Sequence, residues 1–107
     1  MKSKMAKACD ITKRVKDIVW ERDNQRCIRC GTHRAMPNAH YIPRSKGGLG
    51  VEENIVTLCL ACHDAYDHTT EREAIGYFIE GYLKERYPEW DKSKLIYHKW
   101  GVIYDKV

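Results

Sequence analysis

Residues 27–63 read CIRCGTHRAMPNAHYIPRSKGGLGVEENIVTLCLACH, and the two cysteine pairs in them are the strongest indication of the fold. It opens with the pair Cys27 and Cys30 and ends just after the pair Cys59 and Cys62, with residues 31–58 between the two pairs. Two residues between cysteines allow both thiolates to reach one metal ion from a tight turn. Two such turns complete a tetrahedral four-cysteine site, which is the usual arrangement of structural zinc. The sequence therefore predicts a structural Zn²⁺ site that joins two distant segments.

Two other uses of paired cysteines compete with zinc. A redox C-x-x-C needs only one pair and a thioredoxin-like βαβ context, and this sequence offers no such context. Iron–sulfur ligation is a further alternative, although no feature of the sequence favours it. The fifth cysteine, Cys9, lies among lysines without a paired neighbour, and we interpret it as a bystander thiol.

The composition is that of one globular domain in a reducing compartment. The chain has 107 residues, of which 43% are hydrophobic and 32% are charged. Its first residues lack the apolar stretch of a signal peptide, and no run approaches the roughly 18 apolar residues of a membrane span. Five cysteines are also an odd number for disulfide pairing. We therefore expect a cytoplasmic, intracellular protein with no membrane partner.

Positive charge is concentrated near the start of the chain. Residues 1–34 contain ten Lys or Arg and four acidic residues, a net charge of +6 in a chain whose total is +4. A one-sided basic surface is typical of proteins that bind the phosphate backbone of nucleic acid, although charge runs are also common on solvated faces. Lys13 and Lys16 are the candidate backbone contacts in this region.

The length of the chain predicts one domain over 1–107, and its polar, lysine-rich residues 1–9 are expected to be frayed. A core over 11–68 is then followed by a C-terminal helix and tail over 69–107. The expected elements are a helix from Asp10 or Thr12 to about Asp23, strands over 38–42 and 55–58, a loop over 44–54, a helix over 60–68, and a helix that follows a capping box at 70–73 and ends before Pro88.

Several linked features then follow one another in a family-specific order. They are a helix leading into the first cysteine pair, a histidine three residues before a proline (His40 and Pro43), a Gly47-Gly48 loop, Asn54, and His63 directly after Cys62. In this order the sequence resembles the HNH endonuclease family, in its Cys₄-zinc branch that is common among phage proteins. The resemblance covers about residues 11–68. It implies an α+β fold with a small ββα-metal (His-Me finger) core, flanked by N-terminal and C-terminal helices.

The resemblance also implies a role for each residue of the motif. His40 matches the general base, and Asn54 matches the residue whose amide braces the long loop and orients His40. His63 matches a ligand of the catalytic divalent ion, Mg²⁺ or Mn²⁺. Arg44, Lys46 and the Gly47-Gly48 backbone are suited to holding phosphates. The other three histidines have no motif support and are expected on the surface: His33, His68 and His98.

One residue departs from the family pattern. The family usually has Asp or His before the base histidine as a metal ligand, and this chain has Ala39. In one interpretation Asp67, one helical turn after His63, supplies a ligand oxygen, with His68 less well placed. In the other, the protein binds DNA without cutting it.

The favoured expectation is a metal-dependent DNA endonuclease or nicking enzyme, with DNA as its partner and phage packaging proteins as a further partner class implied by the resemblance. The alternative is a non-catalytic, zinc-stabilised DNA-binding module. A third hypothesis, a zinc-stabilised protein-interaction domain, draws on an aromatic tail: Trp90, Tyr97, Trp100 and Tyr104.

Overall fold

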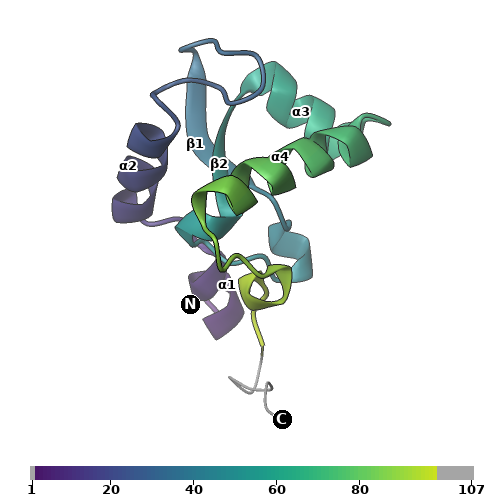
Figure 1. Ribbon diagram of the computed structural model, residues 1–107. Coiled ribbons are helices and arrows are strands. Elements are labelled where there is room, and N and C mark those ends of the chain that lie inside the picture. Colours follow the sequence, from purple (N-terminus) through teal and green to yellow (C-terminus); the bar gives the residue numbers. More distant parts are fainter. Residues whose placement is uncertain (1, 99–107) are drawn as a thin grey trace.

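A computed structural model describes residues 2–98, and it has the predicted α+β architecture (Figure 1). The helices and strands are α1 (Lys4–Cys9), α2 (Lys13–Arg22), β1 (Ala35–His40), β2 (Ile55–Cys59), α3 (Leu60–His68) and α4 (Arg72–Arg86). Three short 3-10 turns join them: η1 (Arg44–Lys46), η2 (Glu52–Asn54) and η3 (Lys92–Leu95). The helix α2 lies on one side of the sheet, and α3 and α4 lie on the other.

The two strands form one antiparallel sheet, and β2 is buried along its whole length. The register shifts between Met36 and Ala39, around Pro37. Because proline has no N–H to donate to the ladder, a bulge is one of the few places where a strand tolerates it. The bulge explains why β1 begins three residues before the predicted strand over 38–42. The strand also ends earlier, at His40.

The hydrophobic core lies between the sheet and the two C-terminal helices. Helix α4 contributes Ile75, Ile79 and Leu83, which recur every four residues and are at most 2% exposed. They pack in one cluster with Val56 and Leu58 of β2. Burying each such side chain contributes roughly 1.5–3 kcal/mol, so the helical stripe read from the sequence anchors α4.

The capping box predicted at 70–73 is not formed. Helix α4 begins at Arg72 without a side-chain cap, and Thr69 makes the local contacts instead. The Thr69 hydroxyl donates to the Ala65 carbonyl at 2.6 Å and accepts from the Glu71 N–H at 3.0 Å. The Thr69 side chain therefore links the turn before α4 to the last turn of α3.

The prediction of a frayed N-terminus is wrong for residues 4–9. They form α1, which Ser3 caps by accepting a hydrogen bond from the Ala6 N–H at 3.1 Å. Cys9 is 1% exposed, and the Gly50 N–H donates to the Ala8 carbonyl at 3.0 Å. Tertiary contact with the β1–β2 loop stabilises this short helix, and the sequence contains no apolar stripe that would have predicted the helix.

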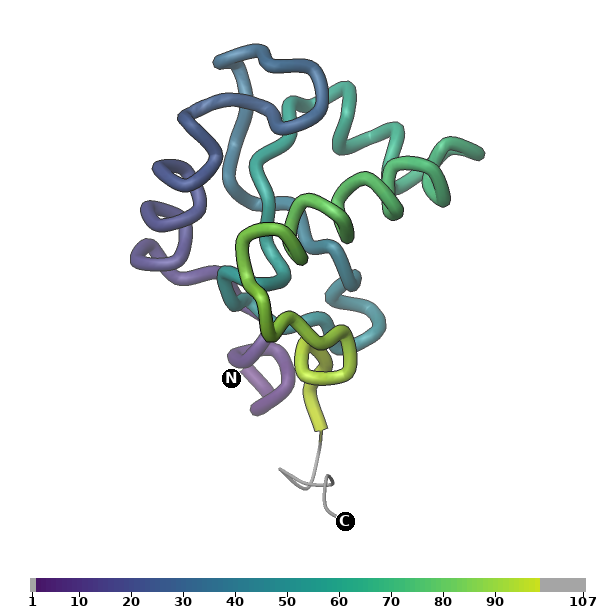
Figure 2. The backbone as a smooth tube through the Cα atoms, in the orientation of Figure 1, coloured from purple at the N-terminus to yellow at the C-terminus, as the bar shows by residue number. Residues whose placement is uncertain are grey.

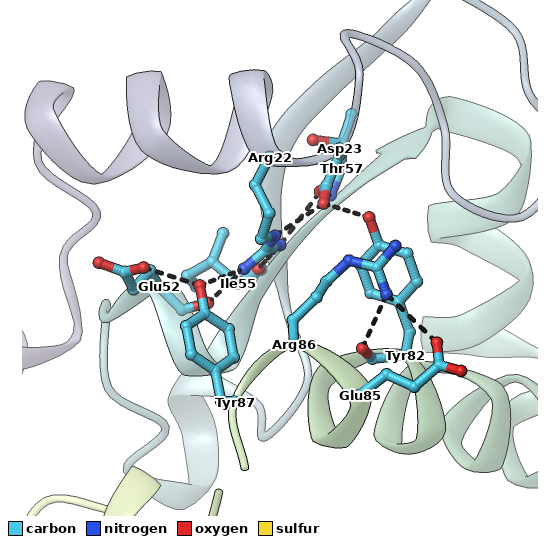
Figure 3. Close-up of polar contacts among 9 residues, drawn as sticks. All are labelled: Arg22, Asp23, Glu52, Ile55, Thr57, Tyr82, Glu85, Arg86 and Tyr87. Carbon is cyan, nitrogen blue, oxygen red and sulfur yellow. Dashed lines mark hydrogen bonds and ion pairs between the residues drawn. The ribbon is translucent and has the colours of Figure 1, made fainter. Parts of the chain in front are cut away.

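A buried polar cluster joins α2, β2 and the end of α4 (Figure 3). Arg22 makes a two-point ion pair with Asp23, whose side chain is fully buried. Asp23 also accepts from the Thr57 N–H at 2.9 Å and from the Tyr82 hydroxyl at 2.6 Å. Arg22 in turn donates to the carbonyl of Ile55 at 2.7 Å. These contacts provide hydrogen-bond partners for backbone groups on the edge of β2 that faces away from β1. Among the described residues, no further strand pairs with that edge.

The C-terminal segment folds back over the loop between the strands (Figure 2). The Leu49 N–H donates to the Leu95 carbonyl at 2.8 Å, and the Tyr97 N–H donates to the Gly47 carbonyl at 2.7 Å. The Trp90 indole donates to a backbone carbonyl at 2.8 Å, and the side chain packs against the hydrophobic core. Of the predicted aromatic tail, Trp100 and Tyr104 lie outside the described residues. Within the part of the chain that is described, no helix has the length and apolar character needed to cross a membrane.

Candidate metal centre and active-site cleft

The four paired cysteines converge on one point. Their sulfur atoms all lie within 4.8 Å of one another, and the Cys30 and Cys59 sulfurs are 3.6 Å apart. Four ligands at the usual Zn–S distance of about 2.3 Å form a tetrahedron with edges of roughly 3.8 Å, so the cluster fits a zinc ion. A redox dithiol would need only two of these sulfurs.

Backbone N–H groups point at two of the four sulfur atoms, and at Cys27 they favour the thiolate. The Cys30 N–H points at the Cys27 sulfur at 3.5 Å, and the Cys62 N–H points at the Cys59 sulfur at 3.4 Å. Burial alone would raise the pKa of Cys27, but backbone N–H donors outweigh it and lower the pKa to about 7. Deprotonated cysteine is the form that ligates metal.

A cleft of about 880 Å³ lies beside the C-terminal end of β1, between α3 and the β1–β2 loop. It gathers most of the side chains that the sequence predicted for the site: His40, His63, Asp67, Arg44, Lys46 and Lys16. It also contains residues that the sequence analysis missed: Lys2, Asp10, Asn38 and Arg72.

His40 is held in one orientation at the wall of this cleft. Its Nε2 lies 2.9 Å from the Cys9 carbonyl oxygen. Because a carbonyl only accepts hydrogen bonds, Nε2 carries the proton, and a neutral imidazole then has Nδ1 as an acceptor. Burial lowers the pKa of His40, and the nearby positive charge of Arg44 lowers it further, although the bond to Cys9 opposes both effects.

His63 and Asp67 face each other on successive turns of α3. The His63 Nε2 and an Asp67 carboxylate oxygen are 3.2 Å apart, and both side chains are partly exposed to the cleft. The pair follows from helical spacing, because residues four apart share one face. An imidazole nitrogen and a carboxylate oxygen are a suitable partial ligand set for a divalent ion.

Asn54 is fully buried and fixes the loop that follows His40. Its side-chain oxygen accepts from the Ile42 N–H at 2.8 Å, and its amide donates to the carbonyls of Ile42 at 3.2 Å and Leu49 at 2.9 Å. One side chain therefore ties together both ends of residues 42–49. Its side-chain contacts are with the backbone of Ile42 and Leu49, and among the described residues they include none with the His40 imidazole.

Ala39 lies in the core and pairs with Val56 across the sheet. It offers no ligand atom. The neighbouring Asn38 lines the cleft together with His40. Because side chains alternate along a strand, residues 38 and 40 share a face, and this alternation could have identified Asn38 from the sequence.

The predicted phosphate contacts divide into two groups. Arg44, Lys46 and Lys16 line the cleft, whereas Lys13 does not and instead pairs with Asp17 at 2.8 Å. The predicted role of the Gly47-Gly48 backbone is wrong. These two N–H groups already donate, at 2.9 Å each, to the carbonyls of Arg44 and Pro43.

Gly47 and Gly48 instead allow the backbone of the loop to adopt its conformation. Gly47 has a φ of 81°, which favours glycine, and a Cβ on Gly48 would lie 1.7 Å from the Ile42 carbonyl oxygen. Of the remaining histidines, His33 and His68 are exposed and lie outside the cleft, and His98 is also exposed.

Comparison with known proteins agrees with this arrangement. A family model described as HNH endonuclease matches residues 27–79, about half of the chain. The match includes both cysteine pairs and the cleft residues of β1 and α3. Searches of curated proteins and of solved structures found no match. With the cysteine cluster, the two-stranded sheet and α3 in the expected order, the chain belongs to the HNH endonuclease family.

Proposed function

We propose that this protein is a metal-dependent DNA endonuclease or nicking enzyme that hydrolyses phosphodiester bonds. The observation that carries the proposal is the cleft in which His40, with its Nε2 held by the Cys9 carbonyl, faces the same space as His63 and Asp67. Basic side chains surround that space. A base, a candidate ion site and phosphate contacts are the minimum that such a reaction needs.

His40 acts as the general base in this proposal. Its Nδ1 accepts the proton of the water that attacks phosphorus. Burial favours the neutral imidazole, which is the form able to take a proton. Asn54 assists by keeping the loop after His40 in place.

His63 and Asp67 would hold the catalytic Mg²⁺ or Mn²⁺. When bound, such an ion supplies positive charge that offsets the charge developing on the phosphate oxygens and on the leaving 3′ oxygen. The Cys27, Cys30, Cys59 and Cys62 cluster would hold a structural Zn²⁺, which leaves no coordination position open for chemistry.

DNA binding rests on the basic side chains in and beside the cleft. Arg44, Lys46 and Lys16 would contact phosphates close to the scissile bond. Lys13 lies one turn before Lys16 on the exposed face of α2, so it would contact the flanking backbone. Such contacts make affinity fall steeply as salt rises.

Ala39 favours a second candidate function. With alanine in place of the family's usual ligand, the ion site has fewer protein ligands, and a zinc-stabilised DNA-binding module without cleavage is the alternative.

A plasmid assay separates the two functions. The full-length, zinc-loaded protein is incubated with supercoiled plasmid in Mg²⁺, Mn²⁺, Ni²⁺ or a chelator, and gel retardation is measured in parallel. The nuclease predicts open-circular or linear product in at least one metal and none in the chelator. Retardation of the plasmid without any product in every metal would establish the DNA-binding module instead.

A further inference from the structure

The N-terminal segment makes the contact that fixes the imidazole of His40. The Cys9 carbonyl oxygen accepts two hydrogen bonds, from His40 Nε2 at 2.9 Å and from Arg44 Nη1 at 2.8 Å. Arg44 also pairs through Nη2 with the Asp10 carboxylate at 3.0 Å. Asp10 is further held by Lys2. Asp10 thus holds Arg44, and Arg44 donates to the same Cys9 carbonyl that binds the proposed base.

This segment is hydrogen-bonded to the loop between the strands and packs closely against its backbone. The Gly50 N–H donates to the Ala8 carbonyl at 3.0 Å. A Cβ on Gly50 would lie 2.0 Å from the Asp10 carbonyl oxygen and 3.0 Å from that of Cys9. Only glycine allows this approach, because a real Cβ essentially never lies as close as 2.0 Å to a backbone oxygen. The same loop is held internally by Asn54.

We propose that residues 3–10 complete the active site, and that Asp10 is a positioning residue: through Arg44 it holds the Cys9 carbonyl against His40 Nε2 and so keeps His40 Nδ1 directed at the water. This inference rests on the proposed nuclease function. It adds an element that lies outside the family match over residues 27–79.

The physical reason lies in the two nitrogens of the ring. A neutral imidazole can carry its proton on either nitrogen and can rotate about its side-chain bonds. A fixed carbonyl at Nε2 selects one tautomer and one ring orientation. Small displacements of a reacting group are costly, on the order of 100-fold for about 1 Å, so an anchor of this kind affects rate more than DNA affinity.

The test compares Asp10→Asn with Asp17→Asn, an equal charge change at an exposed acid on α2 that does not line the cleft. Both are made in the full-length zinc-loaded chain. Single-turnover cleavage is measured over a range of protein concentrations, so that the maximal rate and the apparent Kd are obtained separately. We expect Asp10→Asn to lower the maximal rate about tenfold. The apparent Kd should be unchanged or lower, because Arg44 loses its acidic partner and becomes freer to bind phosphate. Asp17→Asn should leave the rate unchanged.

A spectroscopic measurement makes the test independent of activity. In ¹⁵N-labelled protein, the His40 Nε2–H proton should give a resonance protected from exchange with water, because it is bonded to a buried carbonyl. Asp10→Asn and Gly50→Ala should both weaken that protection, while thermal melting and zinc content report whether each variant is folded. An unprotected His40 Nε2–H in the wild type would overturn the inference, as would Asp10→Asn with wild-type rate and protection. An inactive wild type with a protected Nε2–H would refute the proposed function and leave the anchoring of His40 intact.

Discussion

At the scale of single residues, the proposed chemistry depends on His40 being neutral. Burial and the charge of Arg44 hold the pKa of His40 below the usual value of 6.5. The base works only when deprotonated, so cleavage should rise as pH increases through that lowered pKa and then level off. We predict that the single-turnover rate, measured at saturating metal from about pH 5 to pH 8, reaches half its plateau below pH 6.5. A half-maximal rate above about pH 7 would contradict the assignment.

The same lowered pKa has a consequence for stability. A histidine that is neutral when folded binds a proton more readily when unfolded, so its contribution to folding is present above the unfolded pKa and is lost as pH falls. The chain should therefore become less stable toward acid in the range where His40 begins to titrate in the unfolded state.

Thr57 shows a polar group that the fold leaves unsatisfied. Its hydroxyl is fully buried in β2 and has no hydrogen-bond partner among the described residues. Thr57→Val keeps the branched shape and removes the desolvated hydroxyl, so we expect the free energy of unfolding to rise by about 1 kcal/mol. Chemical denaturation of both proteins with zinc bound measures this difference. A less stable valine variant would show that the hydroxyl has a partner, such as water.

At the scale of elements, the ion pair of Arg22 and Asp23 determines how α2 meets β2. Asp23→Ala removes the partner of a mostly buried guanidinium and two further hydrogen bonds. Breaking a buried pair in this way costs about 3–5 kcal/mol. Tyr82→Phe, the matched control, removes one of the same hydrogen bonds and should cost only about 1 kcal/mol. Equal losses in the two denaturation curves would mean that the ion pair does not contribute as described.

The elements also show what the sequence could predict. Apolar spacing predicted α2 and α4 to within one or two residues, because their buried faces are read from local periodicity, and the predicted bounds of α3 also agree with the structure. The pair of His63 and Asp67 was predicted for the same reason, since it depends only on helical spacing.

Features that depend on contacts between distant residues were missed. The six-residue α1 is too short to be stable alone, and its contact with Gly50 has no local signal. The acceptor for His40 is a backbone carbonyl 31 residues away, and backbone groups carry no residue type that a motif could identify. The bulge in β1 likewise follows from pairing with β2.

At the scale of the whole molecule, the cysteine cluster connects the segment after α2 to the start of α3. Removing zinc should therefore affect both stability and cleavage. We predict that chelation lowers the melting temperature by about 10 °C or more, which corresponds to a loss of only about 2 kcal/mol in a domain of this size. Cleavage should be lost and should return with Zn²⁺ plus Mg²⁺, but not with Mg²⁺ alone.

Cys30→Ser provides the corresponding variant, because Cys30 is the exposed member of the cluster and its substitution disturbs packing least. It should bind less zinc and melt earlier than the wild type. An unchanged melting temperature after complete zinc removal, verified by metal analysis, would argue against a structural metal centre.

The proposed function requires His40 to be the base of a DNA-cleaving site, and two histidine variants test this assignment. His40→Ala and His33→Ala are assayed side by side on supercoiled plasmid, the second removing an exposed histidine outside the cleft. We predict that His40→Ala lowers the single-turnover rate by about 10²- to 10⁴-fold, with zinc content and DNA retardation unchanged. His33→Ala should cleave at the wild-type rate. Cleavage by His40→Ala at the wild-type rate would show that His40 is not the base.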